Sequence, residues 1–146
     1  MKRIVSCILL MLVVSILCSC SVTSSENTIK NFISKYNAHE IYSEEALIDS
    51  SQDSSTNFVV GQSGINIDLS LDENDKIYKV VVSMHTDDSD ATEIVETANR
   101  TMYALGSKNP AFEIPSVISD EVAYFGDFRC YWEKSYYTYK FVCEMR

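Results

Sequence analysis

The two histidines of the chain stand beside carboxylates, a combination of residues that could bind a divalent metal ion. His39 is followed by Glu40, but the metalloprotease pattern H-E-x-x-H requires a second histidine at position 43, which is a serine. His85 is followed within five residues by three aspartates, Asp87, Asp88 and Asp90. Carboxylates this close in sequence can share a cation, yet they also suit the solvated start of a helix. We prefer the second interpretation, so the sequence predicts neither a metal site nor a cofactor.

Nucleophilic catalysis has no better support. The chain lacks the G-x-S-x-G pattern of a serine nucleophile, and neither Cys130 nor Cys143 has a neighbouring histidine that would make its thiol reactive. We therefore predict no catalytic residue. A metal-dependent enzyme is the least supported function class.

The first twenty residues have the composition of an export signal. Lys2 and Arg3 precede a charge-free apolar run from Ile4 to Leu17, and the run ends in Leu17-Cys18-Ser19-Cys20. A basic start followed by a short apolar core is what the export machinery reads. An uncleaved membrane span, which needs ~20 apolar residues, and an ordinary cleaved secretory peptide are the alternatives.

The four residues ending at Cys20 resemble the bacterial lipobox, and the chain as a whole resembles small bacterial lipoproteins. That resemblance implies cleavage after Ser19, so that residues 1–19 are a signal peptide and Cys20 carries the lipid on its sulfur. Two or three acyl chains hold a protein to a bilayer almost permanently. The expected location is therefore the cell membrane, lipid-anchored and facing outside the cytoplasm. The resemblance implies no activity.

The charge balance limits the partners. The full chain has 12 Lys and Arg against 21 Asp and Glu, a net charge of −9, and loss of Lys2 and Arg3 with the leader would make it −11. Nucleic acids and anionic lipid headgroups are bound by clusters of basic residues, so both are poor partners for such a surface. A basic protein is the partner that an acidic surface suits.

The remaining chain is long enough for one domain. Residues 20–25 form a short polar tether, and residues 26–146 are expected to fold as a single globular unit. Fully extended, the tether holds that unit within about 20 Å of the bilayer.

Apolar periodicity predicts an α+β domain. Helical spacing predicts a first helix over 26–38, capped by Ser24 or Ser25, and a second helix capped by Ser89 or Asp90 and ended by Gly106. Strand patterns cover 58–60, 65–71 and 77–84, with an acidic turn at 72–75. With a C-terminal hairpin the order is α-β-β-β-α-β-β. We expect an antiparallel sheet of four to five strands with both helices on one face.

The C-terminal hairpin is rich in aromatic residues. Between Tyr124 and Phe141, nine of eighteen positions are aromatic. Alternation puts Phe128, Cys130 and Trp132 on one face of the first strand. We expect Glu133 to Tyr136 to lie near the turn of the hairpin.

Cys130 and Cys143 could form a disulfide in an exported protein, and two buried free thiols are the alternative. The expected turn conflicts with the bridge. A turn centred on Lys134-Ser135 puts Cys130 opposite Tyr139, too far from Cys143 for a bond. A bridge requires a turn centred near Tyr136-Tyr137, and tyrosines are poor residues for a tight turn.

Five aromatic residues of this hairpin are candidates for a binding surface: Tyr131, Trp132, Tyr136, Tyr137 and Tyr139. The competing interpretation is that aromatics are favoured in strands and simply fill the core. The sequence favours a non-catalytic binding module. An inhibitor or immunity-type lipoprotein that blocks an enzyme or toxin at the membrane is the alternative.

Overall fold

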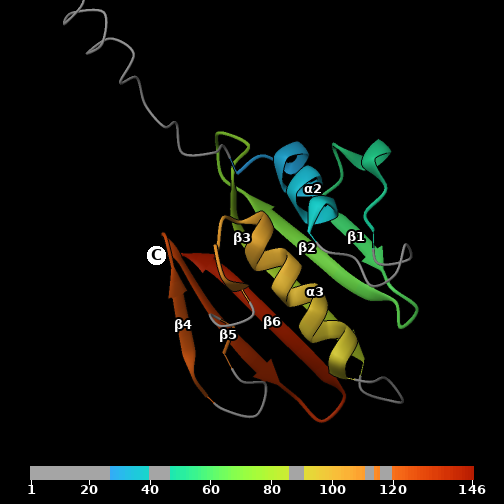
Figure 1. The fold of residues 1–146 in the computed structure, drawn as a ribbon, viewed down its shortest axis with the longest axis vertical. Coiled ribbons are helices and arrows are strands. Elements are labelled where there is room, and N and C mark those ends of the chain that lie inside the picture. Colours follow the sequence, from blue (N-terminus) through green and yellow to red (C-terminus); the bar gives the residue numbers. More distant parts are fainter. Residues whose placement is uncertain (1–26, 40–46, 86–90, 111–113, 116–119) are drawn as a thin grey trace, which may run out of the picture.

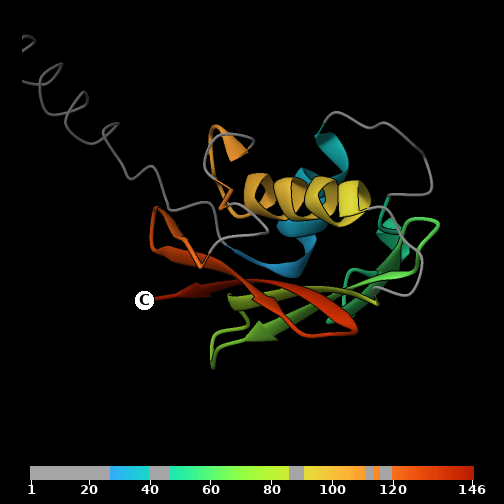
Figure 2. The same cartoon turned by 90° about the horizontal axis from the view of Figure 1, so that it is seen from below.

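A six-stranded antiparallel sheet forms the base of the domain. The computed structural model describes residues 27–39, 47–85, 91–110, 114–115 and 120–146 (Figure 1). The strand order is β1-β2-β3-β6-β5-β4, so the last strand along the chain pairs with β3 in the middle of the sheet. Both helices lie on one side of the sheet, and within the described ranges no helix covers the other side (Figure 2).

The elements follow one another as α2, a 3-10 turn η2, three strands, α3 and three further strands. Their bounds are α2 (Ile29–Ala38), η2 (Ser50–Gln52), β1 (Asn57–Val60), β2 (Ile65–Leu71), β3 (Ile77–His85), α3 (Ala91–Ala104), β4 (Val122–Phe125), β5 (Phe128–Lys134) and β6 (Thr138–Met145). The predicted α+β class with an antiparallel sheet and two helices is confirmed. The predicted number of four to five strands is wrong, because a third strand follows α3.

The additional strand is β4, at the edge of the sheet. It begins at Val122 and ends at Phe125, and residues 116–119 lie outside the described chain. Phe125 pairs with Phe128 across Gly126 and Asp127, and Gly126 has a φ of +51°. Glycine at the first central position of a two-residue loop suits a hairpin, because it adopts positive φ without steric cost.

Helix α2 buries one apolar stripe against α3 and the sheet. Phe32, Ile33 and Tyr36 are buried, as their helical spacing predicts. The helix begins at Ile29 rather than at residue 26, because the Thr28 hydroxyl accepts the Asn31 N–H as the N-cap (3.4 Å). The caps expected at Ser24 or Ser25 lie outside the described residues.

Helix α3 ends where the sequence predicts. Gly106 adopts a φ of +107°, and the N–H groups of Gly106 and Ser107 donate to the carbonyls of Tyr103 and Met102, both at 3.0 Å. These two bonds form a Schellman motif, which glycine favours because it has no Cβ. The expected caps Ser89 and Asp90 lie outside the described residues.

The helix-facing side of the sheet forms the core. Ile67, Val82, Phe141 and Trp132 face one another across β2, β3, β6 and β5, and all four are buried. The opposite face is mostly polar, and its residues alternate with the core residues along each strand. A charged cluster of Lys79, Glu144 and Arg129 crosses it. The described residues therefore form two layers, and no described helix covers the second face of the sheet (Figure 2), called the uncovered face below.

Candidate binding site at the C-terminal hairpin

A disulfide joins the two strands of the C-terminal hairpin. Cys130 and Cys143 lie directly opposite each other on β5 and β6, with their Cα atoms 4.3 Å apart, and both are buried. This spacing is typical of an antiparallel pair that exchanges no backbone hydrogen bonds, where side chains approach most closely. The predicted disulfide is confirmed.

The same pairing moves the turn away from its expected place. The midpoint between Cys130 and Cys143 falls between Tyr136 and Tyr137, and these two residues form the loop. The Ser135 N–H donates to the Thr138 carbonyl across it (3.0 Å). A turn centred on Lys134-Ser135 is therefore wrong, because Glu133 and Lys134 still belong to β5. Of the residues expected near the turn, Tyr136 lies in the loop itself.

Trp132 and Tyr139 lie on the helix-facing side of the hairpin. Trp132 is only 8% exposed, its indole N–H donates to the Pro115 carbonyl (2.8 Å), and its ring contacts Phe141 (4.9 Å between centroids). Tyr139 is partly buried against the same core, and the Lys134 ammonium lies 5.0 Å from its ring centroid. Both residues therefore belong to the packing of the domain.

Tyr131 lies on the uncovered face of the sheet. Its hydroxyl donates to the Glu144 carboxylate (3.4 Å), and the Arg129 guanidinium lies 5.0 Å over its ring. Glu144 also accepts a hydrogen bond from Arg129 and faces the Lys79 ammonium at 3.6 Å. The hydrogen bond from Arg129 is the main cause that lowers the pKa of Glu144 below its usual value. Tyr131 is thus part of a charged cluster.

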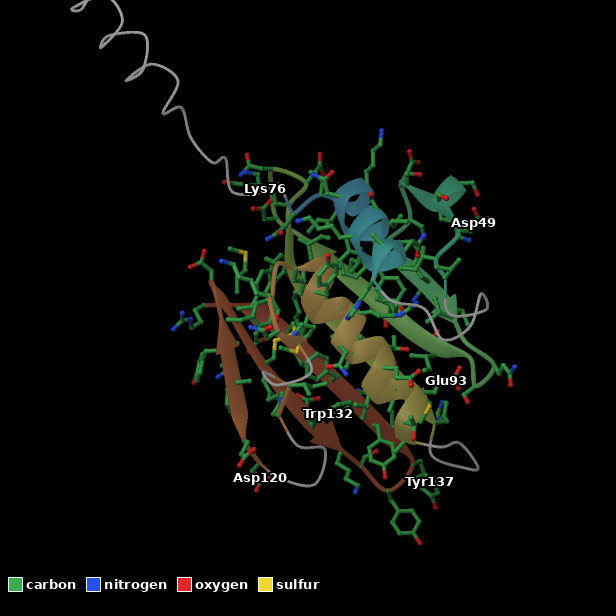
Figure 3. All side chains as sticks on the ribbon, in the orientation of Figure 1. Asp49, Lys76, Glu93, Asp120, Trp132 and Tyr137 are labelled. Carbon is green, nitrogen blue, oxygen red and sulfur yellow. A yellow bond between two sulfur atoms is a disulfide. The ribbon has the colours of Figure 1, made fainter. Side chains whose placement is uncertain are left out.

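Tyr136 and Tyr137 form the tip of the hairpin, and Figure 3 shows Tyr137 there. Their exposed fractions are 85% and 63%. The two rings contact each other edge to face, with centroids 4.9 Å apart and planes at 74°. Of the five aromatic candidates, these two are the ones that the fold leaves open to solvent.

The tip lies at the end of the sheet opposite to the start of the described chain. The Asn27 carbonyl accepts the Ile77 N–H (2.7 Å) at the beginning of β3, whereas His85 at the end of β3 pairs with Thr138 beside the tip. Nine strand residues separate these two points, about 27 Å. In Figure 3, the labelled residues Lys76 and Tyr137 lie at opposite ends of the sheet.

Two lysines, Lys134 and Lys140, flank the tip, and neither was predicted from the sequence as a site residue. A hollow of about 260 Å³ beside the loop is lined by Glu133, Lys134, Ser135, Thr138 and Lys140. In the sequence, Lys134 stands two residues before Tyr136, and Lys140 stands three residues after Tyr137. The register pairs Lys140 with Glu133 on the uncovered face and Lys134 with Tyr139 on the helix-facing side, an arrangement that the sequence alone does not show.

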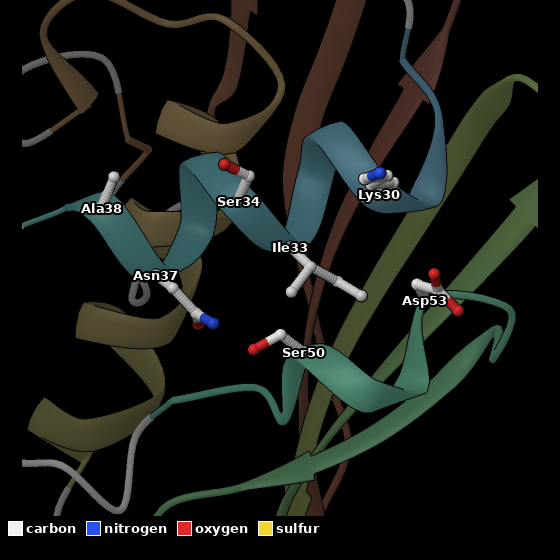
Figure 4. Close-up of a pocket in the computed structure, with 7 residues that line it drawn as sticks. All are labelled: Lys30, Ile33, Ser34, Asn37, Ala38, Ser50 and Asp53. Carbon is white, nitrogen blue, oxygen red and sulfur yellow. The ribbon is translucent and has the colours of Figure 1, made fainter.

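A second hollow lies between α2 and η2 (Figure 4). Its volume is about 420 Å³, and among the described residues that line it are Lys30, Asn37, Ser50 and Asp53. The side-chain amide of Asn37 joins α2 to the segment before η2: it donates to the Ile48 carbonyl (2.7 Å) and accepts the Ile48 N–H (3.0 Å). The described lining includes neither histidine nor cysteine.

The metal hypotheses depend largely on residues outside the described part of the chain. Glu40, Asp87, Asp88 and Asp90 fall in that category, while the His39 ring lies 4.6 Å from the ring of Tyr103. Among the described residues, no group of three or more histidine, cysteine or acidic side chains is placed to hold a metal ion.

One buried charge was not anticipated from the sequence. Arg100 on α3 is 4% exposed, and its guanidinium lies 5.4 Å from the centroid of the Tyr36 ring. Burial raises the pKa of the Tyr36 hydroxyl. An arginine inside an otherwise amphipathic pattern reads as an exposed position, so the periodicity gave no sign of this contact.

Comparison of the chain with protein-family models, with curated proteins and with solved structures gave no match. No described helix is both long and apolar enough to cross a bilayer, and the leader expected over residues 1–19, with the Cys20 lipidation site and the tether over 20–25, lies outside the described residues. The function is therefore argued from the hairpin itself.

Proposed function

We propose that the protein is a lipid-anchored lipoprotein outside the cytoplasm, and that it acts as a non-catalytic binding module through the tip of its C-terminal hairpin. The lipobox-like segment that ends at Cys20 supports the anchor. The disulfide between Cys130 and Cys143 is consistent with an oxidising compartment, because such bridges persist outside the cytosol.

The exposed tyrosine pair carries the proposal. Tyrosine provides a large, stiff contact area with a hydrogen-bonding hydroxyl, and it is enriched among the residues that dominate binding energy at interfaces. Tyr136 and Tyr137 have no role in the core, since most of each side chain is open to solvent. A chain anchored ahead of Asn27 would hold the tip at the far end of the domain, about 27 Å beyond the start of β3.

The anchor is tested with a Cys20→Ala variant. The native protein should fractionate with membranes, and its intact mass should show loss of residues 1–19 and addition of lipid. The variant should keep its leader and carry no lipid. A native mass equal to that of the full unmodified chain would refute the anchor.

The binding tip is tested by photo-crosslinking in the native host. A photoreactive phenylalanine analogue replaces Tyr137 in the full chain, and a control variant carries it at Tyr78, which is 43% exposed near the other end of β3. We expect an adduct from position 137 and none from position 78. Equal labelling at both positions, or none at either, would refute a binding role of the tip.

An inhibitor is the second candidate, and the shape of the tip favours it. A projecting loop held between two disulfide-linked strands is suited to enter the cleft of another protein. Inhibition would appear as loss of activity of a crosslinked enzyme or toxin on addition of the protein. Unchanged activity of that partner leaves the binding module as the function.

A further inference from the structure

The uncovered face of the sheet carries one row of apolar and aromatic side chains across four strands. The register aligns one residue from each of β3, β6, β5 and β4, and we call these four the central row: Val81, Val142, Tyr131 and Val122. Val142 is only 2% exposed although it does not belong to the core beneath the helices, whereas Val122 at the edge of the sheet is 42% exposed. The row therefore opens to solvent toward the β4 edge.

Charged residues flank the central row, with opposite signs on the same strand. On β6, Lys140 and Glu144 stand two positions to either side of the row, and on β5 Arg129 and Glu133 do so. Side chains two positions apart in a strand point to the same face. Because the two strands are antiparallel, Lys140 lies beside Glu133 on one side of the row, and Glu144 lies beside Arg129 on the other.

This pattern is self-complementary under a two-fold axis that runs along the central row. Rotation about that axis stacks a second copy face to face, so that Lys140 meets Glu144 of the second copy. Arg129 likewise meets Glu133 of the second copy, and each contact occurs twice, as in every isologous interface. An axis along β6 would instead place Arg129 against Lys79 and Glu144 against itself. The charges therefore favour a single orientation of the second copy.

The charge of this face also differs from that of the whole chain. The uncovered side of β3, β6 and β5 carries three Lys or Arg and two Glu: Lys79, Lys140, Arg129, Glu133 and Glu144. The chain as a whole has a net charge of −9, so two copies repel each other on average. This face is free of that repulsion.

We infer that the uncovered face binds a second copy of this chain, with the central rows of the two copies in contact along the two-fold axis. This interface goes beyond the binding tip and does not depend on it. On β2 the row continues into Asp68, whose carboxylate accepts a hydrogen bond from the Asn57 amide, so the apolar contact ends at β3.

The size of the contact predicts a weak dimer. Four strands are about 19 Å wide, and five residues along each strand span about 17 Å, which gives roughly 320 Å² per copy in projection. A standard interface buries about 800 Å² per partner. The dimer should therefore be in exchange with the single chain.

Photo-crosslinking of the full chain in its native host tests the surface. A photoreactive phenylalanine analogue replaces Val122 in the central row. The matched control replaces Val59, a valine on the same face that is 64% exposed at the opposite edge, on β1. We expect an adduct of two copies from position 122, with the crosslinked peptide of the second copy in β4 or β5, and none from position 59.

Two charge variants test the orientation. Glu133→Lys and Arg129→Glu each bring like charges together at two contacts, so either variant alone should reduce the yield of the adduct about ten-fold. Co-expression of the two variants with different tags restores opposite charges at one contact of each kind. The adduct should return, and only between differently tagged copies. Glu73→Lys, in the exposed turn before β3, makes the same change of charge away from the face and should leave the yield unchanged.

Several results would overturn the inference. These are no adduct of two copies at position 122, equal adducts at positions 122 and 59, or an adduct with a different protein at position 122. Full yield from either charge variant, or no recovery on co-expression, would also overturn it. Formation of the bridge between Cys130 and Cys143, checked by peptide mapping, shows that β5 and β6 are paired in each variant. The comparison of positions 122 and 59 uses unaltered charges, and the adduct at position 137 tests the proposed function separately.

Discussion

Removing the hairpin disulfide should destabilise the domain by about 3 kcal/mol. Cys130 and Cys143 are separated by 13 positions, and closing a loop of that length in the unfolded chain costs about 3 kcal/mol of chain entropy at 25 °C. Both side chains are fully buried, so replacement by alanine adds a small packing loss. For a domain of this size, we expect the melting temperature to fall by about 10 °C.

Trp132 provides the assay. It is the only tryptophan, it lies two residues from Cys130, and its buried indole reports unfolding of the hairpin by fluorescence. Thermal and urea unfolding are compared for the native chain, the reduced native chain and the double variant Cys130→Ala/Cys143→Ala. The last two should unfold at similar temperatures, and reductant should leave the double variant unchanged.

Two results would refute this reasoning. The first is a double variant that melts within about 2 °C of the oxidised native chain, which would mean that the bridge contributes little. The second is alkylation of both Cys130 and Cys143 in denatured, unreduced protein, located by peptide mapping. That result would show that the thiols are free in the native protein.

Three further substitutions test contacts away from the tip. Glu144→Gln should lower the melting temperature at pH 7, because the pKa of Glu144 is lower in the folded state than in the unfolded chain. This effect should shrink as the pH falls through the lowered pKa, and an effect that stays constant throughout an acid titration would contradict the reasoning. Gly61→Ala should lower the free energy of unfolding in urea by about 2 kcal/mol, because the φ of Gly61 is +74°. The added Cβ would also collide with the carboxylate of Glu93 on α3, which accepts the N–H groups of Gln62 and Ser63. Gly64→Ala is the control, with positive φ but open space, and should cost less. Asn37→Ala should cost about 2 kcal/mol by leaving the backbone of Ile48 unpaired, and a loss below ~0.5 kcal/mol would show that water replaces the amide.

The elements that the sequence revealed are those with long, one-sided apolar patterns. The alternation from Ile65 to Leu71 predicted β2, and the spacing of Ile94, Ala98 and Met102 predicted α3. β4 was missed because four residues contain too little alternation to distinguish a strand from a loop. The place of β4 in the sheet depends on the turn at Gly126 and on its pairing with β5.

The hairpin register shows where local preferences give way to long-range contacts. Turn propensity alone favoured a loop centred on Lys134-Ser135 over one centred on two tyrosines. A turn centred there changes the residues that face each other, so Cys130 no longer meets Cys143 and Trp132 no longer meets Phe141. The contacts of these pairs outweigh the preference of the loop residues. Both the loop preference and the possible pairing of Cys130 with Cys143 are visible in the sequence, but only the packed sheet decides between them.

The Tyr136-Tyr137 loop lacks the residues that a two-residue hairpin loop favours. Two-residue hairpin loops favour Asn-Gly, because both central residues of the preferred turn have positive φ. Neither Tyr136 nor Tyr137 has positive φ, so the loop does not adopt that turn. Local rules are most often broken where a residue serves function. Replacing Tyr136-Tyr137 by Asn-Gly should therefore stabilise the domain by about 0.5–1 kcal/mol in urea unfolding while removing the adduct formed by a photoreactive residue placed at Ser135. A variant that is both less stable and still able to form the adduct would show that the tyrosines serve the fold rather than binding.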